Sequence, residues 1–221
     1  PPADGWPLLV FLHGQGESSP TPLPRVAIQG PPQTCGRAPG TMKMAVLSPQ
    51  KPMSSQFYDN DVADDIEALV DHYVASQKLD GRRIYLTGLS QGSIGTWNLA
   101  AARPSRWAAI APVSGGLRPP FKEAASALKD MPIWAFHAPN DVILPVAMSD
   151  KSVDACKRLA TRTAELKYTR DEAGGSDPSW AAAGIPDMPG HGGMNLVAFY
   201  PSNSPPYPLY EWLLQFRLKN K

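Results

Sequence analysis

The sequence predicts an α/β fold in which helices cover both faces of a mostly parallel sheet. Short apolar runs bounded by turn residues alternate along the chain with longer stretches that have a helical apolar period. Most of the short runs are apolar at nearly every position, which is typical of strands buried on both faces. The expected strands are residues 7–12, 44–48, 83–87, 108–113, 133–137 and 165–169.

The clearest expected helix begins at Asp61. Its apolar side chains repeat on one helical face, at Val62, Ile66, Leu69, Val70 and Tyr73. Acidic residues in its first turn suit the positive end of the helix dipole. Further helices are expected over residues 91–103, 121–129, 147–162 and 207–218. The stretches 15–41 and 171–190 lack such a period and are expected to be long ordered loops.

Composition favours one domain spanning residues 1–221 and a small, neutral partner. The chain has 43% hydrophobic residues, enough for a sizeable core. Its 21 basic and 20 acidic residues give a net charge of +1, so no strong field attracts nucleic acid or anionic lipid. No apolar run approaches the roughly 18 residues of a membrane span. Oligomeric state is not indicated.

The two cysteines, Cys35 and Cys156, permit one disulfide but require none. They are too few to form a metal site by themselves, and neither a metal nor a cofactor is expected. The chain opens on Pro1 without a methionine or a leader, so an upstream segment is expected to have been removed. A secreted or periplasmic compartment is favoured over the cytoplasm, although nothing in the chain decides it.

A pentapeptide of the form G-x-S-x-G, Gly88-Leu89-Ser90-Gln91-Gly92, lies between an expected strand and an expected helix. At such a sharp turn the serine backbone is strained, and only glycine at the flanking positions lets neighbouring chain pass close by. The serine hydroxyl would stand above the sheet, near free N–H groups at the helix start that can stabilise an oxyanion. The alternative is an ordinary helix-capping serine, and the flanking elements favour the nucleophile.

The first expected strand ends in His13-Gly14-Gln15-Gly16, where a second oxyanion donor would lie in this type of site. The N–H of Gln15 is the candidate. A phosphate-binding loop is disfavoured, because no third glycine and helix follow.

A serine nucleophile needs a histidine base, and the sequence contains four histidines. His13 is expected to make structural hydrogen bonds, His72 to face solvent, and His137 to support a neighbouring acid. His191 remains, in an expected loop where glycine on both sides would let the imidazole swing over the serine. The alternative is a surface histidine in a flexible loop.

The carboxylate candidate is Asp141, in the loop after the strand at 133–137. Catalytic groups collect at the carboxyl ends of strands in open parallel sheets. The loop acids Asp171, Asp177 and Asp187 stay open as alternatives. The chain order serine, aspartate, histidine is the order found in α/β-hydrolases.

These segments resemble the phospholipase/carboxylesterase-type α/β-hydrolases, the group that contains acyl-protein thioesterases and small esterases related to polyhydroxybutyrate depolymerases. The likeness covers nearly the whole chain. Five segments carry it. They are an oxyanion loop at residues 12–17, a turn after a strand at 48–50, a nucleophile segment at 83–97, an acid loop at 137–141 and a closing helix at 209–214.

The resemblance implies an α/β-hydrolase fold, either minimal or trimmed at its amino end. It implies a triad of Ser90, Asp141 and His191, with the N–H groups of Gln15 and Gln91 as the oxyanion hole. The chain departs from the family at Ala138, at Ser93 and in the proline-rich residues 201–208. The last departure lies beside the expected site, so substrate preference is not inherited.

The expected pocket walls are Phe57, Trp97, Trp180 and Met194, which lie near the expected rim of the sheet or in long loops. For Trp97, packing beneath the serine turn is an equal alternative. The expected function is hydrolysis of carboxylic esters with short or medium acyl groups through an acyl-enzyme. The alternatives are a peptidase or amidase with the same triad, and a non-catalytic binding module on a hydrolase scaffold.

Overall fold

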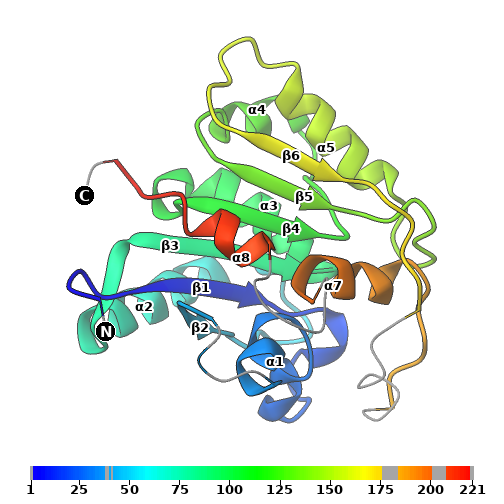
Figure 1. Cartoon of the computed structure of the whole chain (residues 1–221). Coiled ribbons are helices and arrows are strands. Elements are labelled where there is room, and N and C mark those ends of the chain that lie inside the picture. The colour runs from blue at the N-terminus through cyan, green and yellow to red at the C-terminus, as the bar shows by residue number, and fades with distance from the viewer. Residues whose placement is uncertain (1, 38–39, 41, 176–183, 201–207, 220–221) are drawn as a thin grey trace.

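A six-stranded, fully parallel sheet forms the centre of the molecule (Figure 1). The structure, a computed structural model, describes residues 2–37, 40, 42–175, 184–200 and 208–219. The strand order is β2-β1-β3-β4-β5-β6. All six predicted strands are present, as β1 (Trp6–Leu12), β2 (Ala45–Leu47), β3 (Leu79–Leu89), β4 (Ala109–Val113), β5 (Ile133–Phe136) and β6 (Leu166–Thr169).

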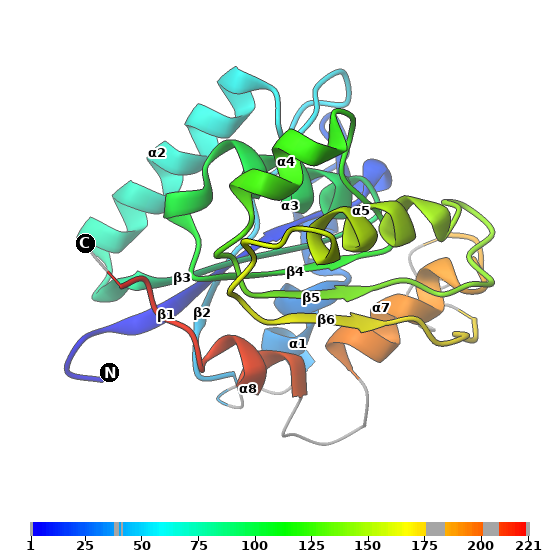
Figure 2. The same ribbon diagram turned by 90° about the horizontal axis from the view of Figure 1, so that it is seen from above.

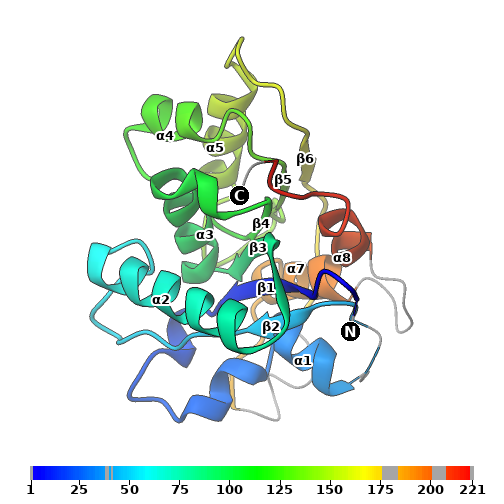
Figure 3. The ribbon, with the colours of Figure 1, turned by 90° about the vertical axis from the view of Figure 1, so that its left-hand side faces the viewer.

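Helices cover both faces of this sheet, as predicted (Figures 2 and 3). One face carries α2 (Asn60–Ser76), α3 (Gln91–Ala102), α4 (Phe121–Ala127) and α5 (Ala147–Lys157). The other carries α1 (Gly30–Arg37), α7 (His191–Phe199) and α8 (Pro208–Leu213). Short 3-10 helices occupy Gln15–Glu17, Leu23–Ala27 and Pro104–Arg106.

Side chains of the central strands alternate between two hydrophobic cores. On β1, Leu8 and Val10 pack into the core under α2 to α5, whereas Leu9 and Phe11 pack into the core under α7 and α8. Fully burying each such side chain contributes about 2 kcal/mol. Because both faces are covered, nearly every position of a central strand is apolar, which explains why these strands could be recognised as continuous apolar runs.

Helix α1 lies inside residues 15–41, which the sequence predicted to be a loop, so that prediction is wrong here. Prolines in its first turn and the lack of an apolar period concealed it. Tertiary contacts hold it instead: the Tyr200 hydroxyl donates to the Gly30 carbonyl at 2.6 Å. A Cβ on Gly30 would lie 2.5 Å from the Phe11 ring, so the helix start packs directly on β1. Two other predicted helices are shorter than expected, since α5 ends at Lys157 and α8 at Leu213.

The two cysteines are free thiols. Cys156 is buried in the core and Cys35 is half-buried, so the disulfide that the sequence left open is absent. Among the residues that the structure describes, no helix combines the length and the apolar character needed to cross a bilayer.

Candidate active site

The candidate catalytic residues lie at the carboxyl end of the sheet. Ser90 joins β3 to α3, Asp141 follows β5, and His191 is the first residue of α7. Figures 1 and 2 show α7 at the end of the sheet where the strand arrows terminate. Parallel strands bring the loops that follow them to one edge, so residues far apart in sequence meet there.

The backbone of Ser90 has the strained conformation that the sequence predicted. Its φ of 60° and ψ of −120° place a non-glycine residue in a region that side chains disfavour. The Ser90 N–H donates to the Val113 carbonyl at 3.0 Å, which ties the turn to β4. A Cβ on Gly92 would lie 1.9 Å from the Leu12 carbonyl oxygen, and one on Gly88 would lie 2.4 Å from the Gly92 carbonyl oxygen. The flanking glycines are therefore sterically required.

The two candidate oxyanion donors begin helical segments. Gln91 is the first residue of α3 and Gln15 the first residue of a 3-10 helix, so neither N–H has an acceptor within its own helix. Their side chains point to other partners: Gln91 Nε2 donates to Gln56 Oε1 at 3.1 Å, and Gln15 Nε2 to Met53 Sδ at 3.1 Å. A Cβ on Gly14 would lie 3.8 Å from Ser90 Cβ, so the loop before Gln15 lies against the serine.

The side chains of Asp141 and His191 are buried and in contact with each other. His191 Nδ1 lies 2.7 Å from Asp141 Oδ2, and the other oxygen, Oδ1, accepts the N–H groups of Ile143 and Leu144 at 2.8 Å each. Burial alone would raise the pKa of Asp141, but hydrogen bonds from His137 and His191 outweigh it and hold the pKa well below its ordinary value. An ionised Asp141 makes His191 Nδ1 the donor, which leaves Nε2 free to accept a proton.

His191 does not lie in a swinging loop, so that expectation is wrong. It begins helix α7 and is 3% exposed. Gly190 has φ 75°, and a Cβ there would lie 2.5 Å from the backbone of Asn140 and Asp141. A Cβ on Gly193 would lie 2.1 Å from the Gly174 carbonyl oxygen. Gly190 therefore allows close packing of helix α7 against the acid loop, and Gly193 allows close packing of the same helix against the backbone of Gly174.

The remaining histidines lie as predicted. His72 is exposed on α2. His13 is fully buried, with Nδ1 2.6 Å from the Gly14 carbonyl and Nε2 accepting the Lys51 N–H at 3.3 Å. His137 Nε2 lies 3.2 Å from Asp141 Oδ2, beside the acid that it was expected to support.

His13 is expected to make the fold less stable in acid. Burial lowers its pKa from 6.5 to about 4, against the opposing hydrogen bond to Gly14. Between these two values the unfolded chain binds a proton that the folded chain does not. Stability therefore falls by about 3 kcal/mol as the pH falls from 6.5 to 4. Urea unfolding of His13→Asn over this range should show a flatter pH dependence than the wild type, and equal slopes would contradict the assignment.

Two of the alternative acids are exposed. Asp171 and Asp187 both lie at the surface, whereas Asp177 is outside the described residues. Asp141 is instead buried against a histidine, so its geometry distinguishes it from both.

The expected pocket walls are largely core residues. Trp97 and Met194 are completely buried, one in each hydrophobic core, so neither has the exposed surface that contact with a substrate needs. Phe57 is 1% exposed, and its ring borders a cavity of about 440 Å³ that Lys51 and Ile66 also line. Trp180 lies outside the described residues. The pocket prediction is therefore corrected for Trp97 and Met194, which pack the core.

Glu17 and Asn140 had no predicted role, and the structure places both near the site. Glu17 is 4% exposed, and its Oε2 lies 3.1 Å from where a Cβ on Gly14 would be. Burial raises the pKa of this carboxyl. Asn140 accepts the N–H of Ala173 at 3.2 Å and donates to its carbonyl at 2.8 Å, which clamps the acid loop. Both residues lie within the motif segments, but only the folded chain brings them to their partners.

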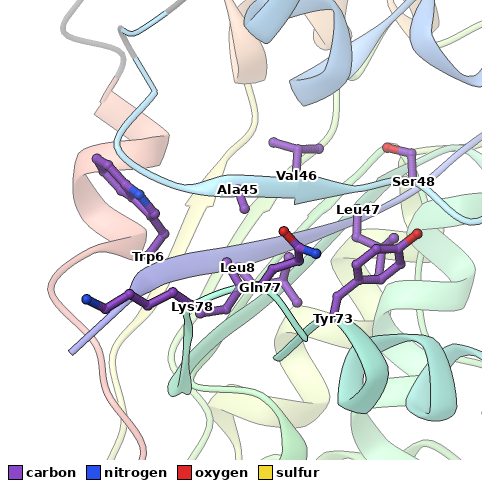
Figure 4. A pocket seen from close by; sticks show the side chains of 10 residues that line it. Trp6, Leu8, Ala45, Val46, Leu47, Ser48, Tyr73, Gln77 and Lys78 are labelled. Atoms are coloured by element: carbon purple, nitrogen blue, oxygen red, sulfur yellow. The ribbon is translucent and has the colours of Figure 1, made fainter. Parts of the chain in front are cut away.

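Another cavity lies away from these residues (Figure 4). It has a volume of about 500 Å³, and its walls come from β1, β2, the last turns of α2 and the turn that joins α2 to β3, including Trp6, Tyr73 and Lys78. Ser90, Asp141 and His191 are not among its walls. Within the described ranges, no three His, Cys, Asp or Glu side chains gather closely enough to hold a metal ion.

A parallel sheet of this order, with a strained serine after β3 and a carboxylate-bound histidine at the start of α7, defines an esterase-type α/β-hydrolase. The chain belongs to the phospholipase/carboxylesterase family, whose model matches residues 36–179, more than half of the sequence.

Solved structures and a curated relative are also similar to this chain. A thermostable esterase superposes with a TM-score of 0.70 at 26% identity, over 98% of this chain and 56% of its own. A feruloyl esterase module from Clostridium thermocellum, complexed with sinapinate, has a TM-score of 0.58 at 14% identity, over 77% of this chain and 71% of its own, and shares the fold. Poly(3-hydroxyalkanoate) depolymerase C from Paucimonas lemoignei is 41% identical over 61 residues. That match covers 28% of this chain and 14% of the depolymerase, so the chain spans only a small part of this relative and about half of the thermostable esterase.

Proposed function

We propose that this protein is a serine esterase that hydrolyses neutral carboxylic esters with short or medium acyl groups, with its catalytic unit within residues 1–221. The observations that carry the proposal are the buried 2.7 Å contact between His191 Nδ1 and Asp141 Oδ2 and the strained turn at Ser90, whose φ is 60°. The net charge of +1 supports a neutral substrate over a polyanion.

In the first half-reaction, Ser90 Oγ attacks the ester carbonyl carbon while its proton passes to His191 Nε2. Asp141 accepts the hydrogen bond from Nδ1 and stabilises the imidazolium that forms. The carbonyl oxygen becomes an oxyanion, which the N–H groups of Gln15 and Gln91 stabilise. The tetrahedral intermediate collapses, the alcohol leaves with the proton from Nε2, and the acyl group remains on Ser90.

In the second half-reaction, water replaces the alcohol. His191 Nε2 takes a proton from the water as its oxygen attacks the acyl-enzyme, and then returns a proton to Ser90 Oγ as the acid is released. The same donors stabilise the second oxyanion. No step requires a metal or a cofactor.

Pre-steady-state hydrolysis of p-nitrophenyl esters tests the proposal. We expect a burst of p-nitrophenolate close to one equivalent per enzyme, because acylation of Ser90 precedes hydrolysis of the acyl-enzyme. A panel graded from acetate to palmitate should favour the short and medium chains. A fluorophosphonate should label Ser90 and abolish the burst. Labelling at another residue would contradict the assignment, and faster cleavage of matched anilides would indicate an amidase.

A further inference from the structure

The turn that follows β2 packs along the segment that continues the oxyanion loop. The Ser19 N–H donates to the Lys51 carbonyl at 2.9 Å, and the Met53 N–H donates to the Ser19 carbonyl at 3.0 Å. The two segments therefore pair like short parallel strands. We call residues 50–53 the anchor turn, and its partner is the segment 17–21.

The side chain of Gln50 binds this segment at both of its ends. Its Nε2 donates to the Glu17 carbonyl at 2.8 Å and to the Thr21 carbonyl at 2.8 Å. A carbonyl oxygen can only accept a hydrogen bond, so the NH₂ group of the amide faces both carbonyls and uses both of its protons. One side chain thus fixes two separate points of the main chain.

Lys51 adds a contact at the middle of the segment. It is 2% exposed, and its Nζ donates to Ser18 Oγ and to the Pro52 carbonyl, each at 3.1 Å. Ser18 is completely buried. Because an ammonium group in the interior needs hydrogen-bond acceptors, Lys51 holds Ser18 against the anchor turn while Gln50 holds the two ends.

The 3-10 helix that begins at Gln15 has little support of its own. It is three residues long, and its backbone hydrogen bonds to the carbonyls of Gly14 and Gln15 are 3.4 Å and 3.2 Å, at or beyond the long end of the usual range. Glu17 ends this helix, and its carbonyl is one of the two that Gln50 binds. The place of the Gln15 N–H beside Ser90 therefore depends on Gln50.

We propose that Gln50 is a positioning residue for the oxyanion hole, which holds the Gln15 N–H in place for the carbonyl oxygen of an ester at Ser90. This role rests on the proposed function. An oxyanion donor stabilises charge that develops only in the transition state, and a misplacement of about 1 Å is enough to slow a reaction about 100-fold. Loss of Gln50 should therefore lower kcat and leave KM nearly unchanged.

Gln50→Met removes both hydrogen bonds and keeps a side chain of similar length. We expect kcat for a p-nitrophenyl ester to fall by about 10-fold to 100-fold, with KM within about threefold of the wild type. Gln215→Met, at an exposed glutamine after α8, is the matched control and should keep the wild-type kcat and KM. A folded Gln50→Met protein with the wild-type kcat would overturn the proposal.

A double-mutant cycle with Gln15 separates positioning of the donor from general support of the fold. Gln15→Pro removes the N–H, and proline suits the first position of a helix. Gly14 has φ −75° and ψ 179°, the extended conformation that a residue before proline prefers. With the donor absent, adding Gln50→Met should cost less than about threefold in kcat. In Gln15→Ala, which loses the same side chain but keeps the N–H, Gln50→Met should still cost about 10-fold or more. Equal losses in the two backgrounds would overturn the proposal.

The order of the loop can be measured without any activity. We expect ¹⁵N order parameters of about 0.85 for Gly16 and Glu17 in the wild type and below about 0.6 in Gln50→Met. Equal values in the two proteins would overturn the proposal even if Ser90 proves to be the nucleophile. A drop in a chain without esterase activity would contradict the proposed function but still support the hold of Gln50 on the loop. If Gln50→Met does not fold, the wild type decides: side-chain amide protons of Gln50 that exchange as fast as those of Gln215 would overturn the proposal, and slow exchange would support it.

Discussion

Ser90→Ala is expected to lower kcat for a p-nitrophenyl ester by about 10⁵-fold or more, with no burst. Alanine removes only Oγ, and no other group can form the acyl-enzyme at that point of the turn. The oxyanion donors remain, so hydrolysis by water should stay somewhat faster than the uncatalysed reaction. Steady-state and burst kinetics on the same preparation measure both effects.

The matched control is Ser126→Ala, at an exposed serine of α4. Its kcat and burst should equal those of the wild type. Both variants should unfold at nearly the wild-type temperature, because residue 90 keeps its backbone bond to Val113. A Ser90→Ala protein with wild-type kcat would rule out the proposed nucleophile.

Asp141→Asn is expected to lower kcat by about 10⁴-fold. The amide oxygen can replace Oδ1 and keep the N–H bonds of Ile143 and Leu144. The amide nitrogen then occupies the place of Oδ2, where it cannot accept from His191. The imidazole must turn its unprotonated nitrogen toward this amide, which places an N–H on the side of Ser90, where a base is needed.

The control for this change is Asp154→Asn, at an exposed position of α5. It removes the same charge from an exposed position that contacts neither Asp141 nor His191, and it should keep full activity. The loss in Asp141→Asn should appear in kcat more than in KM, because the acid acts in the transition state. A variant that raised only KM would place Asp141 in substrate binding instead.

The central sheet and the serine turn could be predicted because their physical requirements are local. A strand covered on both faces has to be apolar along its length, and the turn at Ser90 needs glycine on either side of it. Both requirements leave a direct trace in the sequence. The chain order of Ser90, Asp141 and His191 then follows from the topology of the sheet.

The helix α7 could not be predicted, because its reasons are not local. Its first residues, His191-Gly192-Gly193, have a poor helix propensity and suggested a loop. The glycine at 193 is required by the backbone of Gly174, and the one at 190 by that of Asn140. Such contacts between distant segments leave no period in the sequence.

The residues of the pocket walls could not be predicted for a related reason. Large side chains near the rim of a sheet serve equally well as core or as substrate contacts, and the sequence alone does not separate the two. Trp97 and Met194 lie on the inward sides of α3 and α7, where the packing of both helices on the sheet buries them completely.

The close junction between Gly190 and the acid loop also affects how variant libraries should be designed. A methyl group at Gly190 or Gly193 would force the backbone of one catalytic segment away from its neighbour, so randomising either position yields mostly inactive clones. Gly16, on the oxyanion loop, has nothing within 4 Å of where a Cβ would be. New side chains at Gly16 therefore displace no neighbouring atom and leave the Asp141–His191 contact unchanged, which makes it the more permissive position for laboratory evolution.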